Sequence, residues 1–364
     1  MQVTAVALDE RSQFATVALT LPACPEGGAL LKVEMTGICG SDSKMWRGEI
    51  ATPRPLVMGH EVLGHIHQVS RTLAERSGIR QGDRVVVNVN VPCWSCTLCW
   101  SGQPQLCKNR TFYGCRRSIS DGSGLWGGFA EYMVIEPGSM LHPIKHDVPP
   151  RSAVLLGMIA NGIDWTGRGG IGSQERVVIQ GAGPQGIACA IAAREAGAQS
   201  IVMTGLAHDQ KRLDLADELA GVTKVVIADD CDFESQIRDA LGGELADCVI
   251  DVTGAPSAFM NSIAAARIGG RLVLAGLGGD NKEARVVLDD IVRKNLTLHA
   301  SISKSPASFE RATTLVERGR YELERLVTHT WGLDQVHAAL KSLEGTAEDR
   351  PIKSVVVPAR GNVA

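Results

Sequence analysis

Aromatic residues are scarce in this sequence: they make up 4% of its 364 residues. That scarcity argues against a surface on which nucleic-acid bases stack. An excess of positive charge is missing too, since 37 Lys and Arg face 40 Asp and Glu, for a formal charge of −3. A nucleic acid or an anionic membrane would need a basic face, so we expect neither as a partner.

Long hydrophobic runs are also missing. An uncharged, largely apolar stretch, residues 177–193, is interrupted by glycines and a proline and is too short to span a membrane. The N-terminal MQVTAVALDE has no basic region followed by an apolar one, so we expect no signal peptide. With ten cysteines and no export signal, we expect a cytoplasmic protein whose clustered thiols bind metal rather than form disulfides.

The sequence has enough apolar material for two domains, because 44% of its residues are hydrophobic and 21% are charged. Residues 1–150 contain short β-rich runs between Gly- and Pro-rich turns, which indicates a β domain. Residues 151–295 alternate strands with helices, starting with a strand at 176–180. This alternation predicts an α/β domain whose parallel sheet is covered on both faces. After residue 296 the pattern is mixed.

Four cysteines occur in PCWSCTLCWSGQPQLC with two, two and seven residues between them. They are Cys93, Cys96, Cys99 and Cys107. Four thiolates on a short loop can surround one tetrahedral zinc and leave no open position. An iron–sulfur cluster also uses four cysteines, but the bacterial run has a different final spacing. The spacing therefore favours a structural zinc, and we expect Trp94 and Trp100 in the loop to be packing residues.

A second set of metal ligands lies upstream, in GICGSD and GHE. Cys39, His60 and Glu61 offer a thiolate, an imidazole and a carboxylate, which could hold a zinc that keeps an open, catalytic position. Asp42 could accept the second imidazole N–H of His60 and fix its tautomer. A lone Cys is more often a small core residue, so this assignment depends on the other motifs.

Two further histidines, His65 and His67, follow in EVLGHIHQV. Their alternate spacing places both on one face of a strand. We expect them to be partly solvated strand residues, with metal ligation as the less favoured alternative.

A glycine-rich motif, QGAGPQG, follows the first strand of the second domain. Its glycines, Gly181, Gly183 and Gly186, match G-x-G-x-x-G between a strand and a helix, with Pro184 and Gln185 inside the turn. They permit the tight turn, the backbone approach to a pyrophosphate and the packing of helix on strand. Phosphates then bind at the helix N-terminus. The sequence predicts that these five residues contact a dinucleotide.

The end of the next strand bears on which dinucleotide binds. An acidic residue that binds the adenosine ribose is expected there, but Thr204 is followed by Gly205. His208, Lys211 and Arg212 lie just beyond, so a 2′-phosphate would not be repelled. This arrangement slightly favours NADP over NAD and makes Thr204, Gly205 and Arg212 candidate contacts. Alternatively, the two basic residues are ordinary solvated helix residues.

In this order, the motifs resemble those of the zinc-containing medium-chain dehydrogenase/reductase family, which includes alcohol, sorbitol and threonine dehydrogenases. The likeness covers nearly the whole chain, including WGGFAEY at 126–132. It implies a GroES-like β-barrel catalytic domain at 1–150 that carries the zinc lobe. It also implies a Rossmann domain at 151–295, a return of 296–364 to the catalytic domain, and an active site in the cleft between the domains. Members are usually homodimers or homotetramers.

The resemblance also implies a ligand set for the catalytic zinc. Cys39 and His60 match ligands, and Glu61 matches the neighbouring carboxylate. The third ligand of the family aligns with Gly157, which has no side chain, although a shifted alignment would use Asp164. We therefore expect Glu61 to complete the site. A reductase without catalytic zinc, or a dinucleotide-binding protein without turnover, are the alternatives.

The remaining roles concern the proton, the cofactor and the substrate. Ser41 matches the hydroxyl that contacts the reacting alcohol, and Lys44 lies where many members have a proton-relaying histidine. Lys353 lies about where the family has a basic residue near the cofactor. The resemblance implies oxidation of a secondary alcohol to a ketone. Aromatic and Met side chains in the pocket would suit an apolar or cyclic alcohol, and a polyol is the alternative. Candidate pocket residues, each equally well explained as core, are Trp46, Tyr113, Trp126, Met158 and His299.

Overall fold

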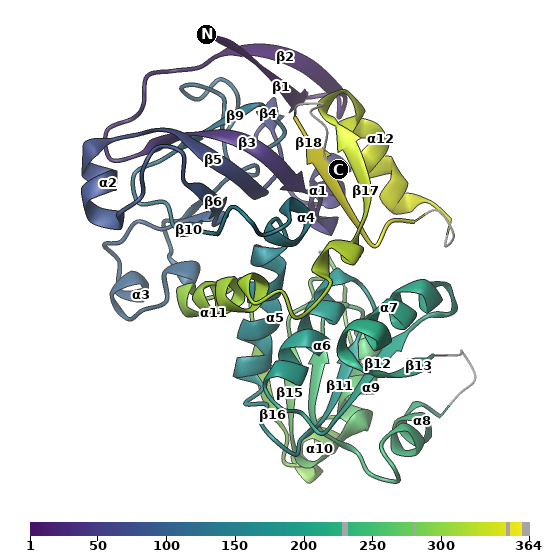
Figure 1. Ribbon diagram of the computed structural model, residues 1–364. Coiled ribbons are helices and arrows are strands. Elements are labelled where there is room, and N and C mark those ends of the chain that lie inside the picture. The colour runs from purple at the N-terminus through teal and green to yellow at the C-terminus, as the bar shows by residue number, and fades with distance from the viewer. Residues whose placement is uncertain (228–231, 280–281, 347–349, 359–364) are drawn as a thin grey trace. The chain divides into compact units, whose positions relative to one another are not determined.

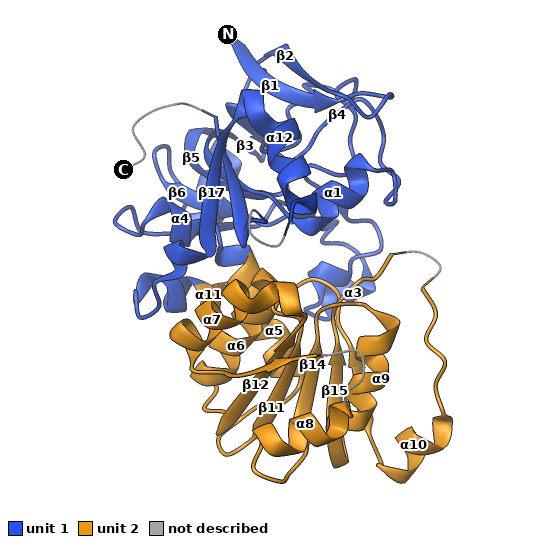
Figure 2. Ribbon diagram, turned by 90° about the vertical axis from the view of Figure 1, so that its right-hand side faces the viewer, with its two compact units in different colours: residues 1–157, 313–364 blue, residues 158–312 orange. Residues whose placement is uncertain are grey.

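The structure, a computed structural model, describes residues 1–227, 232–279, 282–346 and 350–358. Two compact units divide the chain: unit 1 comprises residues 1–157 and 313–364, and unit 2 comprises residues 158–312 (Figure 2). The sequence pattern predicts these boundaries near 150 and 295. The second boundary falls later because β16, Thr297–Ala300, still pairs with the sheet of unit 2. Among the described residues, no helix has the length and hydrophobicity needed to cross a bilayer.

Unit 1 is built mainly from antiparallel strands. Its largest sheet has the order β10-β6-β5-β3-β18-β17, with β9 also paired to β3. Figure 1 shows the C-terminal β18, in yellow, beside the N-terminal β3, and β17 pairs with the other edge of β18. The strands are β1 (Gln2–Leu8), β2 (Phe14–Thr20), β3 (Ala29–Gly37), β4 (Leu56–Val57), β5 (Glu61–Val69), β6 (Arg84–Val87), β7 (Asn90–Val91), β8 (Thr111–Phe112), β9 (Tyr132–Ile135), β10 (Leu141–Pro143), β17 (Val327–Gly332) and β18 (Lys353–Val357).

The helices of unit 1 are short and connect these strands. They are α1 (Gly40–Trp46), α2 (Arg71–Ser77), α3 (Thr97–Trp100), α4 (Pro150–Ala153) and α12 (Val336–Lys341), with η1 (Pro104–Leu106), η3 (Leu323–Leu326), η4 (Leu333–Gln335) and η5 (Ser342–Glu344). Two longer helices, α5 (Leu156–Arg168) and α11 (Pro306–Glu317), each contain residues of both units.

Strand β3 forms the centre of unit 1 and positions the segment that follows it. Successive side chains of a strand point to opposite faces. Accordingly, Leu30 packs in one buried apolar cluster and Leu31 in another. Because β3 is covered on both faces and pairs with β5, β9 and β18, its C-terminal end at Gly37 is held firmly.

Unit 2 has one parallel sheet with the order β13-β12-β11-β14-β15-β16. This is the doubly wound order of a Rossmann domain. Helices α6 and α7 pack together on the strands at one end of this order, and α8 and α9 also pack against each other. The elements are β11 (Arg176–Gln180), α6 (Pro184–Glu195), β12 (Ser200–Gly205), η2 (Ala207–Asp209), α7 (Gln210–Ala220), β13 (Thr223–Val226), α8 (Phe233–Ala240), β14 (Ala246–Asp251), α9 (Pro256–Ala265), β15 (Ala266–Leu274), α10 (Leu288–Arg293) and β16.

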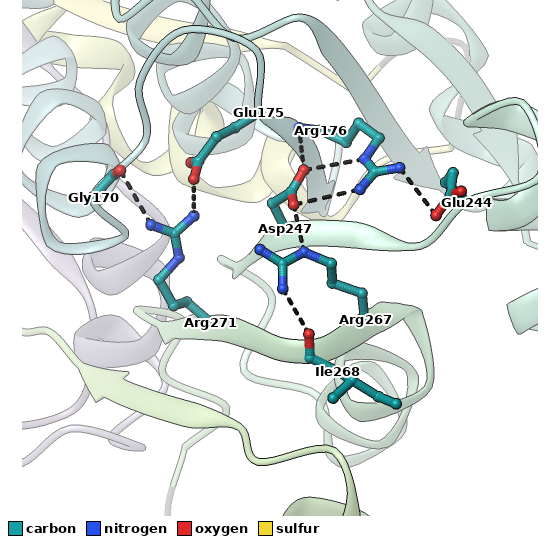
Figure 3. Close-up of polar contacts among 8 residues, drawn as sticks. All are labelled: Gly170, Glu175, Arg176, Glu244, Asp247, Arg267, Ile268 and Arg271. Atoms are coloured by element: carbon teal, nitrogen blue, oxygen red, sulfur yellow. Dashed lines mark hydrogen bonds and ion pairs between the residues drawn. The ribbon is translucent and has the colours of Figure 1, made fainter.

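A charged network ties together the strand ends of unit 2 that lie away from the glycine-rich turn (Figure 3). Asp247 on β14 accepts hydrogen bonds from Arg176 on β11, with Nε at 3.1 Å, and from Arg267 on β15, with Nε at 2.5 Å. Burial alone would raise the pKa of Asp247, but hydrogen bonds from these arginines outweigh it and lower the pKa to about 2. The network therefore joins three neighbouring strands through one buried carboxylate.

Candidate metal and dinucleotide sites

The three upstream metal ligands meet where β3 ends and β5 begins. Cys39 immediately precedes α1, His60 immediately precedes β5, and Glu61 is the first residue of β5. One ligand atom from each residue lies within 4.8 Å of the others. The antiparallel pairing of β3 with β5 explains this convergence, because it sets Gly37 directly opposite Glu61.

Asp42 supports both neighbouring ligands from a fully buried position. Its Oδ1 lies 3.2 Å from Nδ1 of His60, and its Oδ2 accepts the backbone N–H of Cys39 at 2.8 Å. With Nδ1 directed at Asp42, Nε2 is the nitrogen left for a metal. The predicted contact between Asp42 and the imidazole is thus present in the structure.

The charges at this cluster act in opposite directions on two of the ligands. Burial alone would raise the pKa of Cys39, but the hydrogen bond with His60 and the charge of Lys353 outweigh it, so the pKa lies below its usual value. Burial would lower the pKa of His60, but the charge and hydrogen bond of Asp42 raise it well above 6.5. A metal ion must therefore displace a proton from His60, whereas the Cys39 thiolate forms more readily than usual.

Glu61 has a buried partner that the sequence did not indicate. Nζ of Lys353 lies 2.5 Å from Oε2 of Glu61, and Lys353 is 4% exposed. Burial would lower the pKa of Lys353, but the charges of Glu61 and Cys39 raise it. The resemblance predicts that Lys353 lies near the cofactor. In unit 1 its side chain forms an ion pair with Glu61, the carboxylate of the metal cluster.

The donor set fits a zinc ion with an open position: one sulfur, one nitrogen and one carboxylate oxygen converge on one point. Asp164, the alternative third ligand, is used elsewhere. Its Oδ1 accepts hydrogen bonds from the Ser305 backbone and the Ser308 hydroxyl, and its Oδ2 pairs with Arg168 at 2.8 Å. Asp164 thus holds the start of α11 within unit 2, and Glu61 is the carboxylate that lies with Cys39 and His60.

Ser41 and Lys44 lie on α1 next to the cluster. The Ser41 hydroxyl is 3.4 Å from Nε2 of His60. Lys44 is half-buried and lies three residues further along α1, on the same face of the helix. The predicted proton acceptor therefore stands beside the imidazole nitrogen that faces the metal position.

Sequence reasoning missed Cys115, whose thiol forms a hydrogen bond with His60. Cys115 lies on the loop after β8 and is half-buried. No spacing rule marks it, since it belongs to neither cysteine motif. Only the folding of this loop against the start of β5 brings the two residues together.

The four-cysteine lobe has the geometry of a closed metal site. Sulfur atoms lie 3.4 Å apart for Cys93 and Cys107, 3.6 Å for Cys96 and Cys99, and 3.8 Å for Cys96 and Cys107. A tetrahedron with Zn–S bonds of about 2.3 Å has edges of about 3.8 Å, so zinc fits. Hydrogen bonds from Ser95 lower the pKa of Cys93 to about 5, which favours its thiolate.

The two tryptophans of this lobe differ from each other. Trp94 donates its indole N–H to the Gly138 carbonyl at 2.6 Å, although its side chain remains partly exposed. Trp100 on α3 is 76% exposed. The packing role expected for Trp100 is therefore wrong within this chain, because its position on α3 directs the ring to the surface.

The glycine-rich turn has the shape that a dinucleotide pyrophosphate requires. Gly181 follows β11 with φ of +106°, a conformation that glycine adopts readily. A Cβ on Gly186 would collide with the Gly181 carbonyl, whereas a Cβ on Gly183 would meet open space. Gly183 caps α6 and Pro184 is its first residue, so the free N–H groups of this helix start are available for phosphates. Gln185 accepts a hydrogen bond from Asn161.

Beyond β12, no carboxylate is free to bind a ribose among the residues of the strand end and η2. Gly205 ends the strand, and Asp209 is buried with its Oδ2 accepting the Leu206 N–H and its Oδ1 paired with Arg212 at 3.1 Å. His208 is exposed beside them. Thr204 is buried, and its backbone carbonyl accepts a hydrogen bond from the Gly181 N–H, which links β12 to the glycine-rich turn.

Comparison with known proteins identifies families and relatives that this chain resembles. Residues 25–146 match the alcohol dehydrogenase GroES-like domain family, and residues 184–318 match the zinc-binding dehydrogenase family. The "Probable alcohol dehydrogenase adh" of Mycobacterium tuberculosis is 32% identical, over 98% of each chain. The chain belongs to the zinc-containing medium-chain dehydrogenase/reductase family.

Other relatives agree with this membership. The erythritol/L-threitol dehydrogenase of Mycolicibacterium smegmatis is 28% identical over 94% of this chain and 93% of its own length. A crystal structure of an alcohol dehydrogenase from Thermotoga maritima has a TM-score of 0.90 and 25% identity, covering 99% of this chain and 100% of that one. The predicted fold class, a GroES-like domain with a Rossmann domain, is confirmed. This dehydrogenase is an oxidoreductase that acts on CH–OH groups with zinc and a nicotinamide cofactor.

Several candidate pocket residues of this dehydrogenase are packing residues. Tyr113 is 2% exposed, and its hydroxyl contacts Ser139 and accepts the Glu136 N–H. Trp126 is buried and donates its N–H to a loop carbonyl. Trp46 lies against Phe14 and His337. Met158 is also buried, and His299 lies half-buried on edge strand β16.

The two strand histidines lie as expected. His65 and His67 are half-buried on β5. His65 lies 3.1 Å from Glu34, and His67 packs edge-on against Tyr132. Both contacts are those of ordinary residues on a partly solvated strand face.

Proposed function

We propose that this dehydrogenase oxidises a secondary alcohol to a ketone, and reduces the ketone in reverse, at a zinc held by Cys39, His60 and Glu61. The observation that carries the proposal is the convergence of these three donors within 4.8 Å, beside the Ser41 hydroxyl. Three protein ligands leave one position for a substrate oxygen.

The residues of the chain have separate roles in this reaction. When bound, zinc supplies a Lewis acid for the alcohol oxygen, and the nicotinamide accepts the hydride. Asp42 fixes the His60 ring, so that Nε2 keeps its direction. The Ser41 hydroxyl takes the alcohol proton and releases its own proton through the hydroxyls of the nicotinamide ribose, with which Lys44, one helical turn further on, interacts.

The Rossmann unit would bind the dinucleotide through Gly181, Gly183, Gly186 and the N-terminus of α6. We propose NADP as the better substrate, because Gly205 supplies no carboxylate and Asp209 is engaged by Arg212. His208 is exposed at the same strand end and could face a 2′-phosphate. A solved relative from Sinorhizobium meliloti is bound to NADP, whereas one from Escherichia coli is complexed with NADH. Initial rates with each cofactor test this choice, and a kcat/KM that favours NAD contradicts it.

The reaction is tested by following nicotinamide reduction over a panel of cyclic, open-chain and polyol secondary alcohols. Cys39→Ala and His60→Ala should each abolish turnover by removing a metal ligand. Ser41→Ala should lower kcat by about 10²-fold or more, as loss of a proton acceptor does. Full hydride-transfer rates in both ligand variants would refute the zinc mechanism.

We further propose that two copies associate through the exposed edge of unit 2. Within the described part of the chain, β16 pairs only with β15, and none of α10 is buried. Apolar side chains are exposed here, notably Leu288 and Val292, the latter 74% exposed. An unpaired edge strand beside an apolar surface favours pairing with another chain. Sedimentation analysis should give a dimer or tetramer that Val292→Glu weakens; a parent monomer would overturn this proposal.

A further inference from the structure

The Glu61–Lys353 pair connects two strands that are not neighbours. Strand β3 lies between β5, which carries Glu61, and β18, which carries Lys353. Two strands separated by a third are about 9.5 Å apart, so the pair must pass over the middle strand. The middle strand at this level is Gly37, opposite Glu61 on one side and Val355 on the other.

Any side chain on Gly37 would occupy the path of the carboxylate. A Cβ at this position would collide with Oε2 of Glu61 and lie 3.1 Å from its Cβ and 3.3 Å from its Cδ. The closest atom is the end of a flexible side chain rather than backbone. An added methyl group would therefore displace the carboxylate at a modest cost to the fold.

We infer that Gly37 is a positioning residue of the metal site: the gap that it leaves in β3 lets Glu61 cross to Lys353 while staying within reach of Cys39 and His60. This rests on the proposed zinc site. The position of Glu61 matters especially in this chain, because the third zinc ligand of the family aligns with Gly157, which has no side chain. Glu61 must therefore complete the ligand set with Cys39 and His60. The Lys353 ammonium pairs with one carboxylate oxygen of Glu61, and this ion pair holds the Glu61 side chain in the conformation that passes over β3.

The test compares Gly37→Ala, Glu61→Ala and the double variant, each with Co²⁺ replacing zinc. The visible spectrum of Co²⁺ reports its ligand set, and the four-cysteine site contributes equally to every variant. We expect Gly37→Ala and Glu61→Ala to change the spectrum in the same way and to lose the catalytic-site metal to a chelator about 10- to 100-fold faster than the parent. When Glu61 is already replaced by Ala, Gly37→Ala should cause no further change in the spectrum or in the rate of metal loss, because there is no carboxylate left for the new methyl group to displace.

Two results would overturn the inference. One is a Gly37→Ala protein with the parent spectrum and the parent rate of metal loss. The other is a further loss of metal when Gly37→Ala is added to Glu61→Ala, which would indicate damage to the sheet rather than an effect through the carboxylate. The proposed function fails separately, if the unmodified protein holds one zinc or oxidises no alcohol.

Discussion

Replacing Asp42 by Asn should weaken the catalytic zinc without removing a ligand. The change keeps the shape of a fully buried side chain but removes the charge 3.2 Å from Nδ1 of His60. A hydrogen bond to a charged group contributes about 1.5–3 kcal/mol. We therefore expect zinc affinity at this site to fall about 10- to 100-fold, which is typical for loss of a residue that orients a metal-bound imidazole.

The loss should depend on pH in a definite direction. Asp42 raises the pKa of His60 well above 6.5, so protons compete with zinc in the parent protein more strongly as the pH falls. Asp42→Asn relieves that competition, and this gain partly offsets the lost hydrogen bond at low pH. Chelator competition at pH 6 and pH 9 should show the larger affinity loss at pH 9. Equal zinc affinity in both proteins at pH 9 would refute the reasoning.

Three further variants test other parts of the account. Cys107→Ser should lose the structural zinc, so that elemental analysis falls to one zinc per chain; two would contradict the closed site. Asp247→Asn should lower the free energy of unfolding by about 2 kcal/mol at pH 7, because the pKa of about 2 lies below the usual 3.8. That stabilisation is present above pH 4 and lost as the pH falls towards 2, so denaturant titrations of the two proteins should converge there. Lys353→Met leaves the Glu61 carboxylate buried without its cation, and should lower the melting temperature of the metal-free protein while cofactor affinity stays unchanged. Weaker cofactor binding would instead support the role expected from the resemblance.

Local sequence motifs were enough to predict several features of this structure. The four cysteines lie on one short loop, so their convergence follows from spacing alone. The strand at 176–180 has the bounds that the sequence predicts, because a buried strand is a local feature. The helix after the glycine turn begins at Pro184, inside the motif rather than after it, because Pro is favoured at the first position of a helix. Cys39 and His60 could be assigned as metal ligands only together with the other motifs, since a single Cys or His is not informative alone.

Contacts between distant segments could not be predicted in the same way. Lys353 and Glu61 meet because β18 and β5 both pair with β3, and a single lysine near the C-terminus has no pattern that announces this. The contact of Cys115 with His60 is of the same kind. Aromatic residues such as Tyr113 were equally compatible with a pocket and with the core, because composition does not say which way a ring points.

The central claim, that Cys39, His60 and Glu61 hold a catalytic zinc despite Gly157, is tested most directly by counting zinc. Elemental analysis should be made on protein purified without added metal, alongside Cys39→Ala. We expect two zinc ions per chain in the parent protein and one in the variant. One zinc per chain in both proteins would leave only the four-cysteine site and would make the zinc-independent reductase the better explanation.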